Sequence, residues 1–196
     1  MIRKIKRSIR ISRYVIYKET LVDYKENFWA FIGSFLGIGL IAYFQNNFAP
    51  GENLFLIGSF GASSVLVYGA IQSPLAQPRN LIGGHLISAI TGVTVAQLLP
   101  DIIWLTAPLA VSLSIVFMQI SKTLHPPGGA TALIAVIGSE RIKALGYMYV
   151  LNPVLSGACI LLLVALIFNN ITSNRRYPTD KRFTNLIRRI IKKKLY

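Results

Sequence analysis

The sequence predicts an all-α, polytopic membrane helix bundle, and three observations support this fold class. The mean hydropathy is +0.53, with 53% hydrophobic and only 14% charged residues, which is more apolar than a typical soluble domain. The apolar residues gather in six segments that short polar stretches separate. The basic residues gather at the two ends, with 8 of the 21 Lys and Arg in residues 1–27 and 9 in residues 169–196.

The six apolar segments differ in length. A helix needs about 20 apolar residues to span a bilayer, so the first, third, fourth and sixth segments are long enough. The second is marginal and rich in glycine, and the fifth has only 11 residues. These two are therefore expected to be short or discontinuous helices. The segments are residues 28–48, 54–70, 81–99, 103–120, 128–138 and 145–168.

Loop charges favour six crossings over four. Both basic tails are expected on the cytoplasmic side, so the number of crossings is even. Six crossings place Arg79 and Lys122 inside and Asp101 outside, with Arg141 and Lys143 as a local exception outside. Four crossings with re-entrant second and fifth segments would instead place Arg79 and Lys122 outside and Asp101 inside. The first pattern obeys the positive-inside rule better.

The two short segments suggest an internal repeat. Gly-Ala-Ser at residues 61–63 and Gly-Ala-Thr at residues 129–131 lie in corresponding places, each between two long spans. The segments therefore divide into two triplets, residues 28–99 and 103–168. Three crossings in each triplet would make the halves inverted repeats, as in many transporters whose site lies between discontinuous helices.

Three parts of the chain follow from this pattern. We expect a basic N-terminal tail over residues 1–27, a transmembrane domain over residues 28–174, and a basic amphipathic C-terminal tail over residues 175–196. Thr179 or Asp180 is expected to cap a helix in the C-terminal tail. Basic tails beside membrane spans bind anionic lipids, so nucleic acid is not an expected partner. Aromatic residues near span ends are expected in the interfacial belt: Trp29, Trp104, Tyr147 and Tyr149.

Candidate substrate contacts lie at the starts of the two short segments. Helix N-termini offer unpaired N–H groups to an anion, and Ser or Thr hydroxyls add neutral donors. In the fifth segment the expected N–H groups run from Gly128 onward. The alternative is that these small residues only allow close helix packing. The candidates are Pro127, Gly128, Gly129, Ala130 and Thr131 in the fifth segment, and Gly61, Ala62, Ser63 and Ser64 in the second.

The two histidines and two neighbouring residues complete the candidate site. His125 could donate to a substrate, carry a co-transported proton or cap its loop. His85 lies inside the third span, where an ionisable residue indicates function, although it could also bond a neighbouring helix. Asn80 is a candidate cap and substrate contact, and Arg79 either draws anions to the entrance or pairs with lipid headgroups. No metal site or cofactor is expected, because the histidines have no Cys or carboxylate nearby.

Several stretches resemble the HPP family of integral membrane proteins. The string Thr-Leu-His-Pro-Pro-Gly-Gly-Ala-Thr-Ala-Leu at residues 123–133 resembles the family's signature. Residues 61–65, 76–80 with Gly84 and His85, and 176–178 resemble its other blocks. The resemblance implies a small transporter-like protein, and plant-chloroplast and cyanobacterial members are associated with nitrite transport.

The expected function is therefore a channel or secondary transporter for a small monovalent anion, with nitrite first. Formate, nitrate and chloride would accept the same donors. The alternative is a non-transporting membrane scaffold or lipid-binding subunit. An enzyme is not expected, since the chain has neither a hydrolase elbow nor a phosphate loop. We expect a multi-pass cell-membrane protein with both termini cytoplasmic and a possible homo-oligomer. Gly129→Leu is expected to abolish transport.

Overall fold

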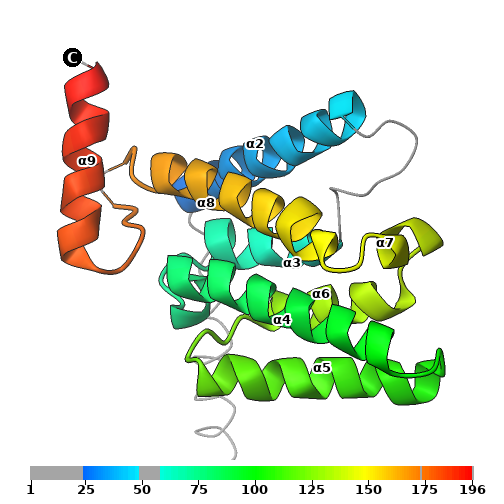
Figure 1. Ribbon diagram of the computed structural model, residues 1–196. Helices are drawn as coiled ribbons and strands as arrows, with labels where there is room; N and C mark the ends of the chain where they lie inside the picture. The colour runs from blue at the N-terminus through cyan, green and yellow to red at the C-terminus, as the bar shows by residue number, and fades with distance from the viewer. Residues whose placement is uncertain (1–23, 49–57, 173, 196) are drawn as a thin grey trace, which may run out of the picture.

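The computed structural model describes residues 24–48, 58–172 and 174–195, with side chains except at 45–48 and 191–195. Within these ranges every regular element is helical (Figure 1). Four helical stretches are long and apolar enough to cross a membrane: α2 (Tyr24–Phe48), α4 (Pro78–Leu98), α5 (Ile103–Ile120) and the stretch Val150–Phe168, which comprises η3 (Val150–Leu155) and α8 (Ser156–Phe168). The expected all-α membrane fold is therefore confirmed.

The second and fifth apolar segments form short helices. The described part of the second segment is α3 (Gly58–Ser64), which continues as the π-helical turn η1 (Val65–Gly69). The fifth is α6 (Pro126–Ile137), with 12 residues. At 1.5 Å per residue, α6 is about 18 Å long, against about 30 Å for a bilayer core. The remaining elements are η2 (Pro74–Ala76), α7 (Glu140–Ala144) and α9 (Lys181–Leu195).

Polar contacts define two ends of the bundle. At one, the basic end, the Arg79 guanidinium donates to the Ser121 carbonyl at 2.7 Å. At the other, the distal end, Lys143 Nζ lies 3.1 Å from Asp101 Oδ2. The hydrogen bond that Lys143 donates to Asp101 raises the pKa of Lys143. Because α6 begins just after Ser121 and ends just before Lys143, it leads from the basic end to the distal end.

Helices α4 and α6 run parallel and pack closely. A methyl group added to Gly84 would lie 2.9 Å from the Thr123 carbonyl oxygen, and one added to Gly92 would lie 2.8 Å from the Cα of Ala132. The order of these contacts is the same along both chains, which sets the parallel direction. Glycine is required at both positions because backbone occupies the space of a side chain.

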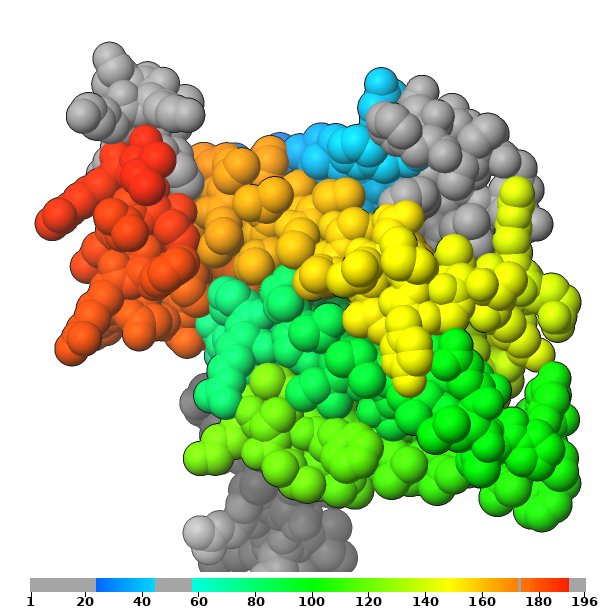
Figure 2. Space-filling view, in the orientation of Figure 1, coloured from blue at the N-terminus to red at the C-terminus, as the bar shows by residue number. Residues whose placement is uncertain are grey.

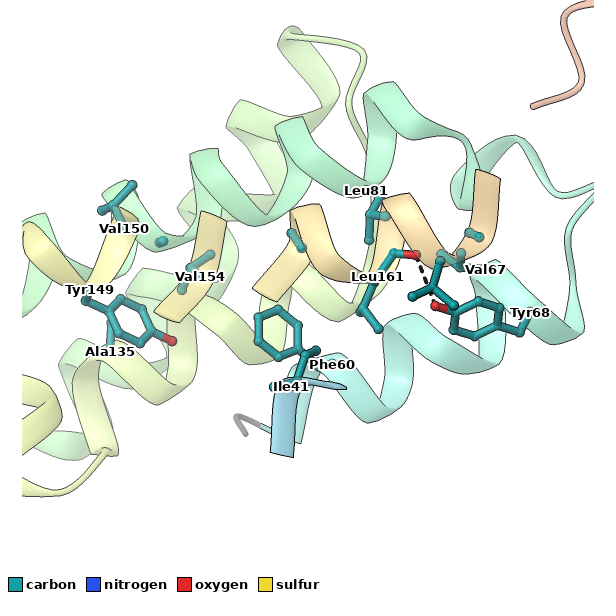
Figure 3. Packing of buried hydrophobic residues seen from close by; sticks show 14 of the residues in the cluster. Ile41, Phe60, Val67, Tyr68, Leu81, Ala135, Tyr149, Val150, Val154 and Leu161 are labelled. Atoms are coloured by element: carbon teal, nitrogen blue, oxygen red, sulfur yellow. Dashed lines mark hydrogen bonds between the residues drawn. The ribbon is translucent and has the colours of Figure 1, made fainter. Parts of the chain in front are cut away.

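The core lies where α8 crosses the second segment (Figure 3). The ring of Phe60 in α3 fills the space beside Gly157 in α8. The hydroxyl of Tyr68 in η1 donates to the Leu161 carbonyl at 3.0 Å. The Tyr68 ring also lies against Gly33 of α2, where a side chain would collide with it. Helix α2 is thereby held against the same core.

Large apolar side chains remain exposed on the outside of the bundle. Trp104 at the start of α5 is 78% exposed, and Phe35 of α2 and Leu163 of α8 are also exposed. Figure 2 shows the side chains of α5 and α8 at this surface. A water-soluble monomer rarely exposes so much apolar surface, whereas lipid covers it in a membrane protein.

The chain after α8 is part of the bundle. The Arg175 side chain is 2% exposed. Its Nη1 lies 2.6 Å from Glu26 Oε2, and its Nη2 donates to the Tyr68 carbonyl at 2.6 Å and to Asn169 Oδ1 at 2.9 Å. Burial lowers the pKa of Arg175, and Glu26 opposes this effect. Arg175 thus packs with the transmembrane helices, and α2, the first helix of the described residues, includes residues 24–27.

Helix α9 lies across the direction of α2 and α8 at the basic end (Figure 1). Asp180 caps it, because its Oδ1 accepts from the Arg182 N–H at 2.8 Å. Thr179 instead donates its N–H to Gln77 Oε1 at 2.9 Å. Of the two expected caps, Asp180 is confirmed. Residues 1–23 of the expected basic N-terminal tail lie outside the described residues.

Candidate functional site

Four polar side chains meet in the interior between the two short helices. They are Ser63 of α3, His85 of α4, His125 just before α6 and Thr131 in the middle of α6, and all four are fully buried. Ser63 Oγ lies 2.7 Å from His85 Nε2 and 2.9 Å from His125 Nε2. His85 Nδ1 lies 2.7 Å from Thr131 Oγ1. We call these four residues the histidine cluster.

The recessed start of α6 places His125 in the interior. Arg79 of α4 contacts Ser121 at the basic end, and Gly84, five residues further along α4, contacts His125. Five residues of helix correspond to about 7.5 Å. The start of α6 therefore lies about 7.5 Å deeper in the bundle than Arg79, measured from the basic end. His125 itself is extended, with φ −139° and ψ 103°, because the following Pro126 disfavours the helical conformation.

One order of protons satisfies the histidine cluster when both imidazoles are neutral. His125 Nδ1 lies 2.8 Å from the Leu75 carbonyl, which only accepts, so Nδ1 carries the proton. His125 Nε2 therefore accepts from the Ser63 hydroxyl. Since Ser63 has one proton to give, His85 Nε2 donates to Ser63 Oγ. His85 Nδ1 then accepts from Thr131. The chain of four bonds runs in one direction, from Thr131 to Leu75.

The start of α6 does not offer the free N–H groups expected from the sequence. Pro126 and Pro127 occupy the first two helical positions and have no N–H. The N–H of Gly128 donates to the His125 carbonyl at 2.8 Å. The expectation that N–H donors from Gly128 onward face a substrate is therefore wrong for Gly128. The available donors here are side chains.

Tyrosines support the histidine cluster from two sides. The fully buried Tyr149 donates its hydroxyl to the Thr131 carbonyl at 3.1 Å. Its expected place in the interfacial belt is therefore wrong. Tyr177, also buried, donates to the Ala76 carbonyl at 2.8 Å, next to Leu75, and burial raises its pKa. Neither tyrosine carries a sequence signal that separates it from an interfacial residue.

The other predicted residues of the second segment divide by exposure. Gly61 and Ala62 are exposed, so they lie outside the cluster. Ser64 is buried, and its Oγ has no hydrogen-bond partner within the described residues. The same holds for Ser59, one turn before Ser63, which sequence reasoning missed. A buried hydroxyl without a partner is costly, and at Ser64 it leaves a donor for another group.

The remaining predicted residues lie around the start of α6 and α4. Pro127 is buried, and Gly129 and Ala130 are half-buried. Asn80 donates to the Leu124 carbonyl at 2.7 Å and so holds the loop before His125 rather than capping α4. Arg79 is exposed at the basic end and holds Ser121. Neither Arg79 nor Asn80 contacts the histidine cluster through the hydrogen bonds that it makes here.

Space is tight at Gly128 and open at Gly129. A methyl group on Gly128 would lie 2.6 Å from Ser88 Oγ and 3.0 Å from Met118 Sδ, whereas one on Gly129 meets only Val111 at 3.8 Å.

Gly128→Ala is expected to lower the unfolding free energy by about 1–3 kcal/mol through overpacking. Gly129→Ala should raise it by about 0.5–1 kcal/mol. Thermal unfolding in detergent measures both, and equal midpoints for the two variants would contradict the packing described. Close packing in this part of α6 therefore occurs at Gly128 and not at Gly129.

Cavities lie near both ends of the bundle. One of about 390 Å³ at the basic end is lined by Glu26, by residues 69–73 and by Asn174. A smaller one of about 110 Å³ at the distal end is lined by residues that include Asp101, Val136 and Lys143. Neither lining includes a member of the histidine cluster. Within the described residues, no three His, Cys, Asp or Glu side chains form a group that could hold a metal ion.

These features define a polytopic helical membrane protein with a buried polar centre. A family model described as "HPP, transmembrane region" matches residues 19–178. The chain belongs to this HPP transmembrane family.

Two relatives from Dictyostelium discoideum, each described as a transmembrane protein, are 46% and 47% identical over 160 residues. The matches cover 80% of this chain and 51% and 56% of the relatives. The chain thus spans about half the length of the curated relatives it matches. No solved structure matches it.

Proposed function

We propose that the protein transports a small monovalent anion across the membrane, with nitrite as the first candidate. The observation that carries the proposal is the histidine cluster, a set of polar side chains fully buried in a membrane domain. Polar residues inside a membrane are costly and mark substrate or ion pathways. The cluster lies between two short helices, where transporters built from discontinuous helices bind their substrates.

The path of the chain supports six crossings in two inverted triplets. The ion pair of Lys143 with Asp101 puts the loop before α5 and the segment after α6 at the same end. A re-entrant fifth segment would leave these two charges on opposite sides of the membrane. The contact between Glu26 and Arg175 likewise puts the start of α2 and the end of α8 at one end, as an even number of crossings requires.

Neutral donors would bind the anion. The hydroxyls of Ser63 and Thr131 and the N–H groups of the imidazoles replace water around a small anion without holding it by a fixed charge. Ser64 adds a buried hydroxyl that has no partner among the described residues. The cavities at the two ends fit a closed state that separates an outer from an inner approach. Arg79, exposed at the basic end, would attract anions to that approach.

The test is nitrite uptake into proteoliposomes that contain the full chain. Uptake above that of protein-free liposomes is expected, with sodium and ammonium excluded. Formate, nitrate and chloride compete in the same assay and rank the anions. No anion uptake by a well-folded protein would favour a non-transporting scaffold. One observation favours that reading, since every member of the histidine cluster already has a hydrogen-bond partner.

The basic C-terminal helix fits an anionic lipid surface. Phe183, Leu186 and Ile190 form an exposed apolar stripe on α9, while Lys181, Arg182 and Arg189 are also exposed. Such a helix lies in the membrane interface with its basic side chains near lipid phosphates. The course of α9 across the spans in Figure 1 is the direction that an interfacial helix takes. The proposed partners are thus an inorganic anion and anionic lipid.

Both termini are proposed to be cytoplasmic, because both tail sequences are basic and α2 begins where the segment after α8 lies, at the basic end; basic segments favour the cytoplasmic side. In a Cys159→Ala background, an impermeant maleimide should label Asp101→Cys on intact cells and Arg176→Cys only after permeabilisation. Both positions are exposed, so access and not burial decides labelling. Labelling of Arg176→Cys on intact cells would reverse the orientation. Labelling of neither or both without permeabilisation would contradict six crossings. A homo-oligomer would not alter these outcomes.

A further inference from the structure

The histidine cluster has room for one additional proton. Thr131 Oγ1 has two acceptors within reach, His85 Nδ1 at 2.7 Å and the Pro127 carbonyl at 3.4 Å. If His85 Nδ1 takes a proton, Thr131 turns its hydroxyl to Pro127 and accepts from His85 instead. Every other hydrogen bond of the cluster stays as it is. Protonation thus requires one hydroxyl to rotate and leaves no donor unpaired.

We propose that the two imidazoles share one proton, which passes between them through Ser63 and is carried together with the anion. This inference rests on the proposed transport function. In the transfer, the proton on His85 Nε2 moves to Ser63 Oγ while the Ser63 proton moves to His125 Nε2. His85 is left neutral with its proton on Nδ1, and the positive charge is on His125. No bond other than O–H and N–H bonds changes.

The relay leads toward the basic end. His125 Nδ1 donates to Leu75 in η2, and η2 follows Ile71 and Ser73, which line the 390 Å³ cavity at that end. The other end of this series of hydrogen bonds is Thr131. It lies on α6, which leads from His125 toward the distal end. The cluster therefore joins the two directions from which a proton and an anion would arrive in alternating access.

The charge balance couples the proton to the anion. The two rings lie edge to face with centroids 5.0 Å apart, and two titratable side chains, Tyr149 and Tyr177, hydrogen-bond the backbone beside the cluster at Thr131 and Ala76. Among the described residues, no Asp or Glu joins the two histidines in one group. An unpaired buried charge is costly, so an imidazolium here needs a counter-ion. A monovalent anion bound to the cluster supplies it, which makes the transported unit electrically neutral.

The direct test is solid-state NMR of the full chain in lipid bilayers with ¹⁵N-labelled histidine. The sequence has only two histidines, so a tag without histidine leaves two rings to assign. At pH 8, one ring should carry its proton on Nε2 and the other on Nδ1. With nitrite at a saturating concentration to supply the counter-ion, both rings should respond together with one midpoint between pH 8 and pH 5, where imidazoles titrate. Two separate midpoints, or no protonation above pH 5, would overturn the proposal.

Two serine variants make the test specific. Ser63→Ala removes the relay hydroxyl, so only one ring should then respond to pH. Ser59→Ala removes a buried hydroxyl from the same helix face one turn away, where it has no partner, and should titrate like the wild type. A Ser63→Ala protein that titrates like the wild type would refute the relay.

Coupling is measured in proteoliposomes with a pH-sensitive dye inside. An inward nitrite gradient should acidify the lumen beyond the background of protein-free liposomes, and an imposed membrane potential should leave the uptake rate unchanged. Uptake that follows the potential without acidification would refute proton coupling while supporting anion transport. If no uptake occurs, the proposed function fails, and the NMR experiment alone decides whether the imidazoles share a proton.

Discussion

Arg175→Met is expected to lower the unfolding free energy by about 2–5 kcal/mol. The substitution leaves the Tyr68 carbonyl and Asn169 Oδ1 without the donor that Arg175 now provides. Each buried acceptor without a partner costs about 1–3 kcal/mol. Glu26 adds less, because its side chain is 41% exposed and water screens the lost ion pair.

The neighbouring arginine is a matched control for this prediction. Arg176 is exposed, so Arg176→Met removes the same charge from the same segment without emptying a buried site. Thermal unfolding in detergent should show a lower midpoint for Arg175→Met than for Arg176→Met. Equal midpoints would show that the Arg175 contacts contribute nothing to the joining of α2, η1 and α8.

Gly92→Leu should have a still larger effect, with a loss of at least about 3 kcal/mol or no folded protein at all. Even the first carbon of the new side chain would meet the backbone of Ala132 and the Cβ of Ala135. Overpacking against mobile side chains costs about 1–3 kcal/mol, but the backbone of α6 has no alternative rotamer. Helices α4 and α6 would have to separate.

Gly39 of α2 is the control for Gly92, because a methyl group there meets nothing within 4 Å. Gly39→Leu should express and elute as the wild type does in size-exclusion chromatography. A Gly92→Leu protein with the wild-type elution profile and thermal midpoint would contradict the close contact between α4 and α6.

Hydropathy predicted the elements well because a membrane imposes length and polarity on each span. The four long spans and the short fifth helix follow from apolar run lengths, and the run of Pro126, Pro127 and Gly128 fixes where α6 begins. The sequence did not show that the next donor after these prolines, the N–H of Gly128, is taken by the His125 carbonyl.

The meeting of Ser63 with both histidines was not predictable from spacing alone. It depends on the depth at which α6 starts, which the loop contacts of Arg79 and Asn80 set across 42 and 44 residues of sequence. Burial of Arg175 and Tyr149 was missed for a related reason. Basic and aromatic residues near span ends usually face lipid headgroups, and only tertiary contacts distinguish these two.

The measurement that tests the central claim most directly is nitrite uptake by three matched proteins: the wild type, Ser63→Ala and Ser59→Ala. Both variants remove one buried hydroxyl from α3, but only Ser63 bonds the two histidines. With equal folding by thermal unfolding, Ser63→Ala should lose at least about tenfold in uptake rate, about 1.4 kcal/mol in barrier height, while Ser59→Ala retains the wild-type rate. Wild-type uptake by Ser63→Ala, or an equal loss in both variants, would contradict a transport site at the histidine cluster.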